Sequence, residues 1–510
     1  MCGIAAAYGG IEDDDCSRML ERLAHRGPDD EGSVRIGDSW LGHRRLSIVD
    51  LDGGKQPLSN AAGTLFLVGN GEIYNHEELR QTLSPAKFLT RSDNEVALHL
   101  FDQRGPDAFT ELHGMYAFVI AGNDGRFVAA RDPVGIKPLY WARRDGQVRF
   151  ASEMRTFDED WRPHVELFPP GHYWTPDGGM VPFATAVTHD TRVLERFDGP
   201  SEPGAPVPDA ILTRVRDQLI RTVEGQMMGD VPVGVFLSGG LDSSLVAAIA
   251  ARWCERHGQQ LSTFAVGLED APDLLAARAV AEHLGTDHHE RIYTAGEAIR
   301  VLPEVIGVLE SYDPSLVRSA VANYLLAEFT AKHVKVVLTG EGADEIFAGY
   351  HYLREFDTEK LLHAELVRII EGLHSINLQR GDRVTMAYGL EARVPFLERD
   401  MIALGLAMPA GWKLAGEGQP EKRLLRQAFE GWLPDDLLWR KKAQFGDGSG
   451  AATALQDTME ASVTEDEFRR ERIEVEPIPR TREELAYYRL FTKALPGIDA
   501  RDNVGLFVHA

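Results

Sequence analysis

The sequence predicts two domains of different fold class. Residues 2–185 are expected to form an α+β domain, because short β-type runs there are punctuated by Gly, Asn and Asp and interrupted by two helical stretches. Residues 209–495 are expected to form an α/β domain with a doubly wound parallel sheet, because apolar strands alternate with helical stretches. The length of 510 residues agrees with this division, since it is too large for one hydrophobic core.

The elements of the first domain can be placed from local pattern. Strands are expected at 64–68, 115–120, 126–130 and 147–151, and helices near 13–25 and 92–103. A segment rich in Pro and Gly at 197–208 is typical of a linker and follows this domain.

The second domain begins with helical periodicity over 211–226. Strands are then expected at 233–237, 262–266 and 334–338, and the pattern from about residue 360 onward is mostly helical. We find no internal repeat.

Composition excludes several classes of protein. The net charge of -25 argues against a nucleic-acid partner, because a phosphate backbone attracts basic surfaces. No apolar run approaches the ~20 residues that span a bilayer, and no signal peptide is recognisable. The three cysteines show no disulfide or metal-type spacing, which is typical of a reducing compartment and predicts a cytoplasmic protein.

Cys2 is the first candidate functional residue. Removal of Met1 would place a thiol and a free α-amino group on one residue. The amine, with a pKa of about 8, could take the thiol proton itself. Cys2 could then act as a nucleophile without a second residue as base.

Residues 70–75 (NGEIYN) follow the strand expected at 64–68. Asn-Gly is commonly a hairpin turn. The Asn70 side-chain amide and the Gly71 backbone N–H can instead form an oxyanion hole for attack on an amide. An Arg for the α-carboxylate and an Asp for the α-ammonium would hold a free amino acid, and the segments around Arg45 and Asp93 supply both types.

A phosphate-binding loop is predicted at residues 237–244 (LSGGLDSS), between an apolar strand and a helix. Gly239 and Gly240 allow close approach of the backbone, and the helix N-terminus favours an anion. Asp242 can hold magnesium. No Lys-Ser/Thr pair follows, so this is not the usual NTPase loop.

Two further strand ends should face the same crevice, because ligands of doubly wound sheets lie beyond the carboxyl ends of the strands. One is at residues 264–268. The other is at 338–345, where Glu341, Asp344 and Glu345 form an acidic cluster.

These motifs together carry a family resemblance. The first ~185 residues resemble a class II glutamine amidotransferase domain, which implies the layered sandwich of N-terminal-nucleophile enzymes. The rest resembles a synthetase domain of the ATP-pyrophosphatase type. The match runs in order to about residue 490 and includes Tyr312-Asp313, residues 389–396 (GLEARVPF) and 440–445 (RKKAQF). The chain is thereby identified as a member of the glutamine-hydrolysing asparagine synthetase B family.

The resemblance implies a role for each matching position. Cys2 would be the glutaminase nucleophile, with Asn70 and Gly71 as the oxyanion hole. Arg45 would hold the glutamine carboxylate, helped by Glu72 and Asp93. The remaining roles fall on the second domain. The resemblance implies an ATP site lined by Leu237, Val266, Thr339 and Gly340, and a pyrophosphate site formed by Ser238, Gly239, Gly240, Asp242 and Ser243. Asp242 and Asp344 would ligate magnesium, Glu341 would assist formation of β-aspartyl-AMP, and Lys442 would reach the phosphates.

The implied reaction uses glutamine, aspartate and ATP, with Mg²⁺. Glutamine supplies ammonia, aspartate is adenylated with loss of pyrophosphate, and ammonia displaces AMP to give asparagine. The resemblance also implies a dry passage for ammonia, for which Met115 is one candidate lining residue, and a homodimer.

Three alternatives remain at this point. One is an enzyme like β-lactam synthetase, which closes a ring on the adenylated carboxylate. Cys2 and Asn70 are retained and position 341 is Glu where the lactam-forming relatives carry Tyr, so both features disfavour it. A second is an amidotransferase that acts on a different carboxylate, which the sequence argues against less strongly. The third is a non-catalytic protein that binds glutamine or ATP.

Overall fold

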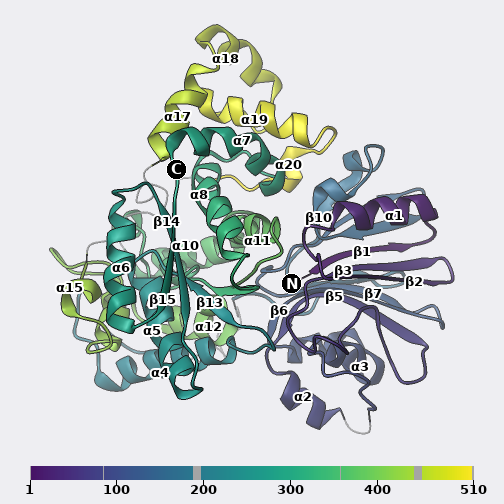
Figure 1. Ribbon diagram of the computed structural model, residues 1–510, viewed down its shortest axis with the longest axis horizontal. Helices are drawn as coiled ribbons and strands as arrows, with labels where there is room; N and C mark the ends of the chain where they lie inside the picture. The colour runs from purple at the N-terminus through teal and green to yellow at the C-terminus, as the bar shows by residue number, and fades with distance from the viewer. Residues whose placement is uncertain (1, 84–85, 188–196, 357, 441–450, 508–510) are drawn as a thin grey trace.

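The computed structural model describes residues 2–83, 86–187, 197–356, 358–440 and 451–507. In Figure 1 the first domain lies on the right, the α/β domain lies on the left, and helices of the C-terminal part lie above them. The label of the N-terminus lies near the middle of the view, between the two domains.

The first domain contains two antiparallel sheets packed face to face. Their strand orders are β10-β8-β9-β1-β3-β2 and β12-β11-β7-β6-β5-β4. The strands are β1 (Cys2–Tyr8), β2 (Asp30–Ile36), β3 (Ser39–Arg45), β4 (Leu58–Ser59), β5 (Leu65–Ile73), β6 (Gly114–Gly122), β7 (Phe127–Arg131), β8 (Tyr140–Arg144), β9 (Gln147–Ala151), β10 (Val165–Leu167), β11 (His172–Thr175) and β12 (Gly179–Pro182).

Alternation along the strands explains the layers. In β1, Ile4 and Ala6 face the second sheet, whereas Ala5 and Ala7 face helix α1 (Asp13–Arg22). The outer face of the second sheet packs on α2 (His76–Thr82) and α3 (Glu95–Arg104). The result is a four-layer sandwich with an apolar core at each of its three interfaces.

The expected strands at 64–68, 115–120, 126–130 and 147–151 are confirmed as parts of β5, β6, β7 and β9, and the two expected helices as α1 and α3. One expectation is wrong: Asn70 and Gly71 lie inside β5, not after it. Gly71 permits the longer strand, because it has φ 144° and a Cβ there would lie 1.9 Å from the Met115 carbonyl oxygen on β6.

The second domain contains a five-stranded parallel sheet of order β15-β14-β13-β16-β17. Its strands are β13 (Val233–Phe236), β14 (Ser262–Gly267), β15 (Asp287–Ile292), β16 (Val336–Leu338) and β17 (Glu391–Arg393). Chain order therefore runs outward in both directions from β13, and the switch point lies between β13 and β16. The expected doubly wound sheet is confirmed.

The helices of this domain and of the C-terminal part cover both sides of the sheet and extend beyond it (Figure 1). They are α4 (Asp209–Gly225), α5 (Leu241–Arg256), α6 (Pro272–Leu284), α7 (Ala295–Leu309), α8 (Pro314–Thr330), α9 (Ala343–Ile346), α10 (Glu359–Gly372), α11 (Asn377–Met386), α12 (Arg399–Ala407), α13 (Ala410–Lys413), α14 (Arg423–Ala428), α15 (Asp435–Leu438), α17 (Ala452–Ala461), α18 (Glu465–Glu471), α19 (Arg482–Ala494) and α20 (Ala500–Asn503).

The two domains share hydrophobic cores. Leu46, Met115 and Ile136 of the first domain belong to one buried cluster with Val215 and Val235 of the second. Met115, a candidate for the ammonia passage, is therefore fully buried in this shared core. Because burial of apolar area is the main stabilising term, the domains are held as one packed unit.

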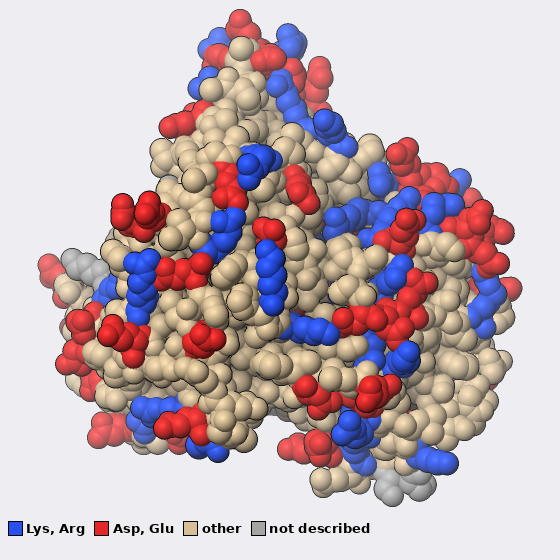
Figure 2. Space-filling model, viewed as in Figure 1, with Lys and Arg blue, Asp and Glu red and all other residues tan. Residues whose placement is uncertain are grey.

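Acidic and basic side chains are interspersed over the face shown in Figure 2. Among the described residues, no helix combines the length and apolar character that crossing a membrane requires.

Candidate active sites

Cys2 begins β1 and lies beside β3 and β5. Its side chain is 7% exposed, and its Sγ lies 4.0 Å from the Leu46 carbonyl oxygen. The Cys2 backbone N–H donates to Asn70 Oδ1 at 2.9 Å, and Arg26 Nε donates to the Cys2 carbonyl oxygen at 3.0 Å. Burial raises the pKa of the Cys2 thiol. Ionisation of the thiol therefore requires a proton acceptor at the site. Met1 lies outside the described residues.

The Asn70 side-chain amide has the arrangement that an oxyanion hole needs. Its Oδ1 is held by Cys2, while its buried Nδ2 has no hydrogen-bond partner within the described part of the chain. A buried donor without a partner is costly, so its place beside the Cys2 thiol indicates a ligand oxygen. The Gly71 carbonyl oxygen accepts from Asn94 Nδ2 at 3.0 Å, which fixes the neighbouring peptide.

Arg45 lies directly opposite Cys2 in the β1–β3 pairing. Its guanidinium donates to the backbone carbonyl oxygens of Val49, Asp50 and Leu51 at 3.2, 2.7 and 3.0 Å. In this structure Arg45 therefore holds the chain at 49–51. The role that the sequence predicts for Arg45, binding the glutamine carboxylate, stays a prediction.

The two predicted carboxylates of the glutamine site are buried. Asp93 Oδ2 accepts from the Ile73 backbone N–H at 2.7 Å, and Glu72 Oε2 lies 3.6 Å from Arg393 Nη2 of the second domain. Burial raises the pKa of both carboxyl groups. The structure thus brings Cys2, Asn70 and Gly71 together with these two acids around one end of the sandwich.

A cavity of about 780 Å³ opens at the switch point of the parallel sheet. Every residue that the sequence predicts for the nucleotide site, apart from Lys442, lines it: Leu237, Ser238, Gly239, Gly240, Asp242, Ser243, Val266, Thr339, Gly340, Glu341 and Asp344. Lys442 lies outside the described residues.

The loop before α5 is shaped for close approach of a ligand. Gly239 has φ +70°, and a Cβ there would lie 2.5 Å from Ala276. Ser238 Oγ lies 3.1 Å from Ser243 Oγ and accepts from the Gly240 N–H at 3.3 Å. Gly239 is thus required by packing, and the hydroxyls and the start of α5 form an edge that could bind an anion.

Lys422 is a site residue that the sequence analysis missed. It precedes α14 with φ 55°, is 2% exposed, and pairs with both Asp242 and Asp344, the latter at 2.7 Å. Burial opposes its charge, but the two carboxylates outweigh burial and raise the pKa of Lys422. The sequence offers no means to find Lys422, because it lies outside a regular element and no periodic pattern sets it apart from other lysines.

Glu341 faces α11 across the cavity. Arg380 of α11 forms an ion pair with Glu341 and donates to Ser319 Oγ of α8 at 2.9 Å. Glu345 is buried, accepts from Tyr350 and Asn377, and has its pKa raised to about 7, mainly by burial. Helices α8 and α11 therefore form a wall of the cavity that the acidic-loop motif alone did not reveal.

The cavity reaches the domain interface. Ile136 and Lys137 of the first domain line it together with Ala392 and Val394, which lie at β17. The space next to the nucleotide loop therefore extends toward the domain that carries Cys2.

Comparison with known families matches both domains. Residues 1–174 match the family described as "Glutamine amidotransferase domain", and residues 214–361 and 354–502 match that described as "Asparagine synthase".

Curated relatives align over nearly the whole chain. A protein of Dictyostelium discoideum named "Probable asparagine synthetase [glutamine-hydrolyzing]" is 38% identical over 99% of this chain and 95% of its own. "Asparagine synthetase [glutamine-hydrolyzing] 2" of Arabidopsis thaliana is 39% identical, over 99% and 89%. A Schizosaccharomyces pombe relative is 39% identical, over 97% and 94%.

Among solved structures, a glutamine phosphoribosylpyrophosphate amidotransferase from B. subtilis covers 57% of this chain and 81% of its own, at 20% identity and a TM-score of 0.33. At that score the likeness carries no argument about function. The sequence identity to the curated relatives extends over nearly the whole chain and therefore shows the family. The chain belongs to the asparagine synthetase family whose members carry an N-terminal glutamine amidotransferase domain.

Proposed function

We propose that the chain synthesises asparagine from aspartate, with ammonia from glutamine and energy from ATP, and releases glutamate, AMP and pyrophosphate. One observation carries the proposal: a buried cysteine beside an unpartnered amide donor, and a cavity lined by the predicted nucleotide residues, occur in one chain of this family.

In the glutaminase step, the Cys2 thiolate attacks the side-chain amide carbon of glutamine. The C–N bond breaks, a thioester forms, and ammonia leaves with the proton that the α-amino group took from the thiol. Asn70 Nδ2 and the Gly71 N–H hold the developing oxyanion. Water then hydrolyses the thioester to glutamate. Arg45, Glu72 and Asp93 orient the substrate.

In the synthetase step, the β-carboxylate of aspartate attacks the α-phosphorus of ATP, and pyrophosphate leaves. The loop of Ser238 to Ser243 binds pyrophosphate, while Leu237, Val266, Thr339 and Gly340 line the ATP site. Lys442 reaches the phosphates, and Glu341 assists formation of β-aspartyl-AMP. Ammonia then attacks the acyl carbon and expels AMP.

Magnesium fits the carboxylates that face Lys422. Asp242 and Asp344 converge on one ammonium group, so their oxygens already surround a position that favours positive charge. Hard cations prefer such oxygen ligands. When bound there, Mg²⁺ would neutralise charge on the pyrophosphate leaving group.

We also infer that the chain works in the cytoplasm as a homodimer. A sedimentation experiment on the purified protein should return the mass of two chains, and the mass of one chain would contradict the dimer.

The experiment that tests the proposal measures pyrophosphate release with ATP and a panel of carboxylates. Aspartate should exceed glutamate, β-alanine and larger carboxylates by at least about 10²-fold, because the acceptor must match the cavity beside Glu341. Preference for another carboxylate would replace asparagine synthesis with amidation of that acid. Release without any need for ammonia or glutamine would favour a ring-closing enzyme.

A further inference from the structure

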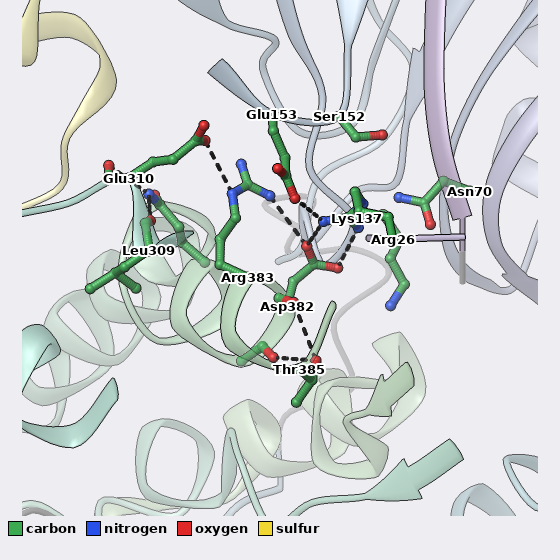
Figure 3. A network of polar contacts seen from close by, with 12 residues as sticks. Arg26, Asn70, Lys137, Ser152, Glu153, Leu309, Glu310, Asp382, Arg383 and Thr385 are labelled. Atoms are coloured by element: carbon green, nitrogen blue, oxygen red, sulfur yellow. Dashed lines mark hydrogen bonds and ion pairs between the residues drawn. The ribbon is translucent and has the colours of Figure 1, made fainter. Parts of the chain in front are cut away.

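Five charged side chains form a buried chain of ion pairs across the domain interface, here called the interface ring. Arg26 and Glu153 come from the first domain, and Asp382, Arg383 and Glu310 come from the second (Figure 3). Arg26 pairs with Glu153 at 2.8 Å and with Asp382 at 2.8 and 3.1 Å. Arg383 pairs with Asp382 and Glu310, both at 3.2 Å.

The ring closes on the first domain again. The Glu310 carboxylate accepts from the backbone N–H groups of Met154 and Arg155 at 3.0 and 2.7 Å. These residues directly follow Glu153 in the chain. The ring therefore joins two segments of the first domain through one segment of α11 and one residue at the end of α7.

Because these charges are buried, any loss of pairing among them would cost free energy. Arg26, Glu153, Arg383 and Glu310 are 0% exposed, and Asp382 is 5% exposed. A buried charge is costly unless it is paired and hydrogen-bonded, so each member depends on its neighbours to hold its position. Arg26, with two carboxylate partners, is fixed from both domains.

Arg26 is also in direct contact with the nucleophile's backbone. Its Nε donates to the Cys2 carbonyl oxygen at 3.0 Å, while the Cys2 N–H donates to Asn70 Oδ1. Arg26 is thus the residue through which the interface ring touches Cys2. Asp382 supplies the bidentate partner of its guanidinium, and it does so from the synthetase domain.

We propose that Asp382 is a positioning residue for glutamine hydrolysis: through its bidentate pair with Arg26, the synthetase domain holds Cys2 in line with the oxyanion donor Asn70. Asp382 touches neither substrate nor reacting atom in this role. The proposal rests on the proposed role of Cys2 as nucleophile.

Helix α11, which carries Asp382, also contacts the synthetase cavity. Arg380, two residues earlier on the same helix, pairs with Glu341 in the synthetase cavity. Nine of the ten residues of α11 are buried, so the helix is packed tightly between the two sites. A shift of Cys2 relative to Asn70 would therefore require either that α11 moves or that the Arg26–Asp382 ion pair breaks.

The test is Asp382→Asn in the full chain. Arg26 keeps Glu153 as a partner, Arg383 keeps Glu310, and the buried Lys137, which Asp382 also stabilises, keeps the influence of Glu391, so the protein should fold. We expect kcat for glutamine hydrolysis to fall about tenfold, because the thiolate is misaligned at the transition state. The KM for glutamine should stay within about twofold, and so should asparagine synthesis from ammonium salts.

Arg383→Gln is the matched variant. It breaks the same ring but leaves the Arg26–Asp382 pair, so glutamine hydrolysis should fall by less than about threefold. A merely structural ring would make both variants lose hydrolysis equally. Asp217→Asn, at an exposed site on α4, controls for loss of one acid and should leave hydrolysis unchanged.

Three outcomes overturn the proposal: unchanged hydrolysis in Asp382→Asn, an equal loss in Arg383→Gln, or a loss of ammonia-dependent synthesis in parallel. Failure of the proposed glutaminase role is a separate result, because the unsubstituted protein would then release no glutamate from glutamine.

Discussion

The two candidate sites differ in how they meet solvent. Around Cys2, the predicted residues Asn70, Glu72 and Asp93 are each less than 5% exposed. The nucleotide residues, by contrast, line an open cavity of about 780 Å³.

The site around Cys2 is therefore closed to solvent, whereas the predicted nucleotide site is an open cavity. Cys2 is itself 7% exposed, and Arg45, which lies opposite it in the β1–β3 pairing, holds the stretch 49–51 through three carbonyl groups. A closed site also keeps ammonia away from bulk water, which an adenylation site open to three substrates cannot do alone.

Cys2→Ala gives the largest expected effect and tests whether the sites are separable. Glutamine-dependent synthesis should fall below detection, because no nucleophile remains. Synthesis from ammonium salts should persist, since the cavity is untouched. Asparagine and pyrophosphate are measured with each nitrogen source. Loss of both activities would show that the two sites are not independent.

Asp242→Asn should act on the open site alone. We expect pyrophosphate release to fall by about 10²-fold with either nitrogen source, because a carboxylate that faces Lys422 and the proposed magnesium position is lost. Glutamine hydrolysis measured without ATP should be unchanged. Pyrophosphate release at the original rate would remove Asp242 from the site.

Lys422→Gln should have a smaller effect of about tenfold on pyrophosphate release. The two carboxylates then lose their buried cation, so the magnesium concentration needed for half-maximal rate should shift. A titration of Mg²⁺ against initial rate checks this. If neither the rate nor the titration midpoint changes, Lys422 is a structural residue only.

The pH dependence of stability probes the interface between the two regions. Burial opposes ionisation of Asp382, but Arg26 outweighs it and holds the pKa of that carboxyl below its usual value of 3.8. A lowered carboxyl pKa contributes stability above the unfolded pKa, and this is lost as pH falls through the folded value.

The unsubstituted protein should therefore be more stable than Asp382→Asn by about 1–3 kcal/mol at pH 7. The difference should shrink as the pH falls below 3.8 toward the lower pKa of the folded state. Urea unfolding of both proteins across this range measures it, and a difference that grows on acidification would have the wrong sign for this ion pair.

Much of the fold could be predicted because local pattern and packing agree. The strands around Leu67, Val119 and Val235 are apolar and bounded by turn residues, so period and length identify them. The edge strand β15 (DHHERI) escaped prediction because it is polar, and β17 because it has only three residues. Asn70 was misplaced because Asn-Gly is typical of turns, whereas here Gly71 continues a strand.

The sequence by itself determined the two domain classes. It also predicted a nucleophile at Cys2 and a phosphate-binding loop at 237–244, because each of these features depends on contiguous residues with a local physical meaning. Only the tertiary structure decided what lies between them. Lys422 meets Asp242 across 180 positions, and Arg26 meets Asp382 across 356. Such pairs leave no local pattern, because they form only when folding brings distant segments together and packing removes the paired charges from water.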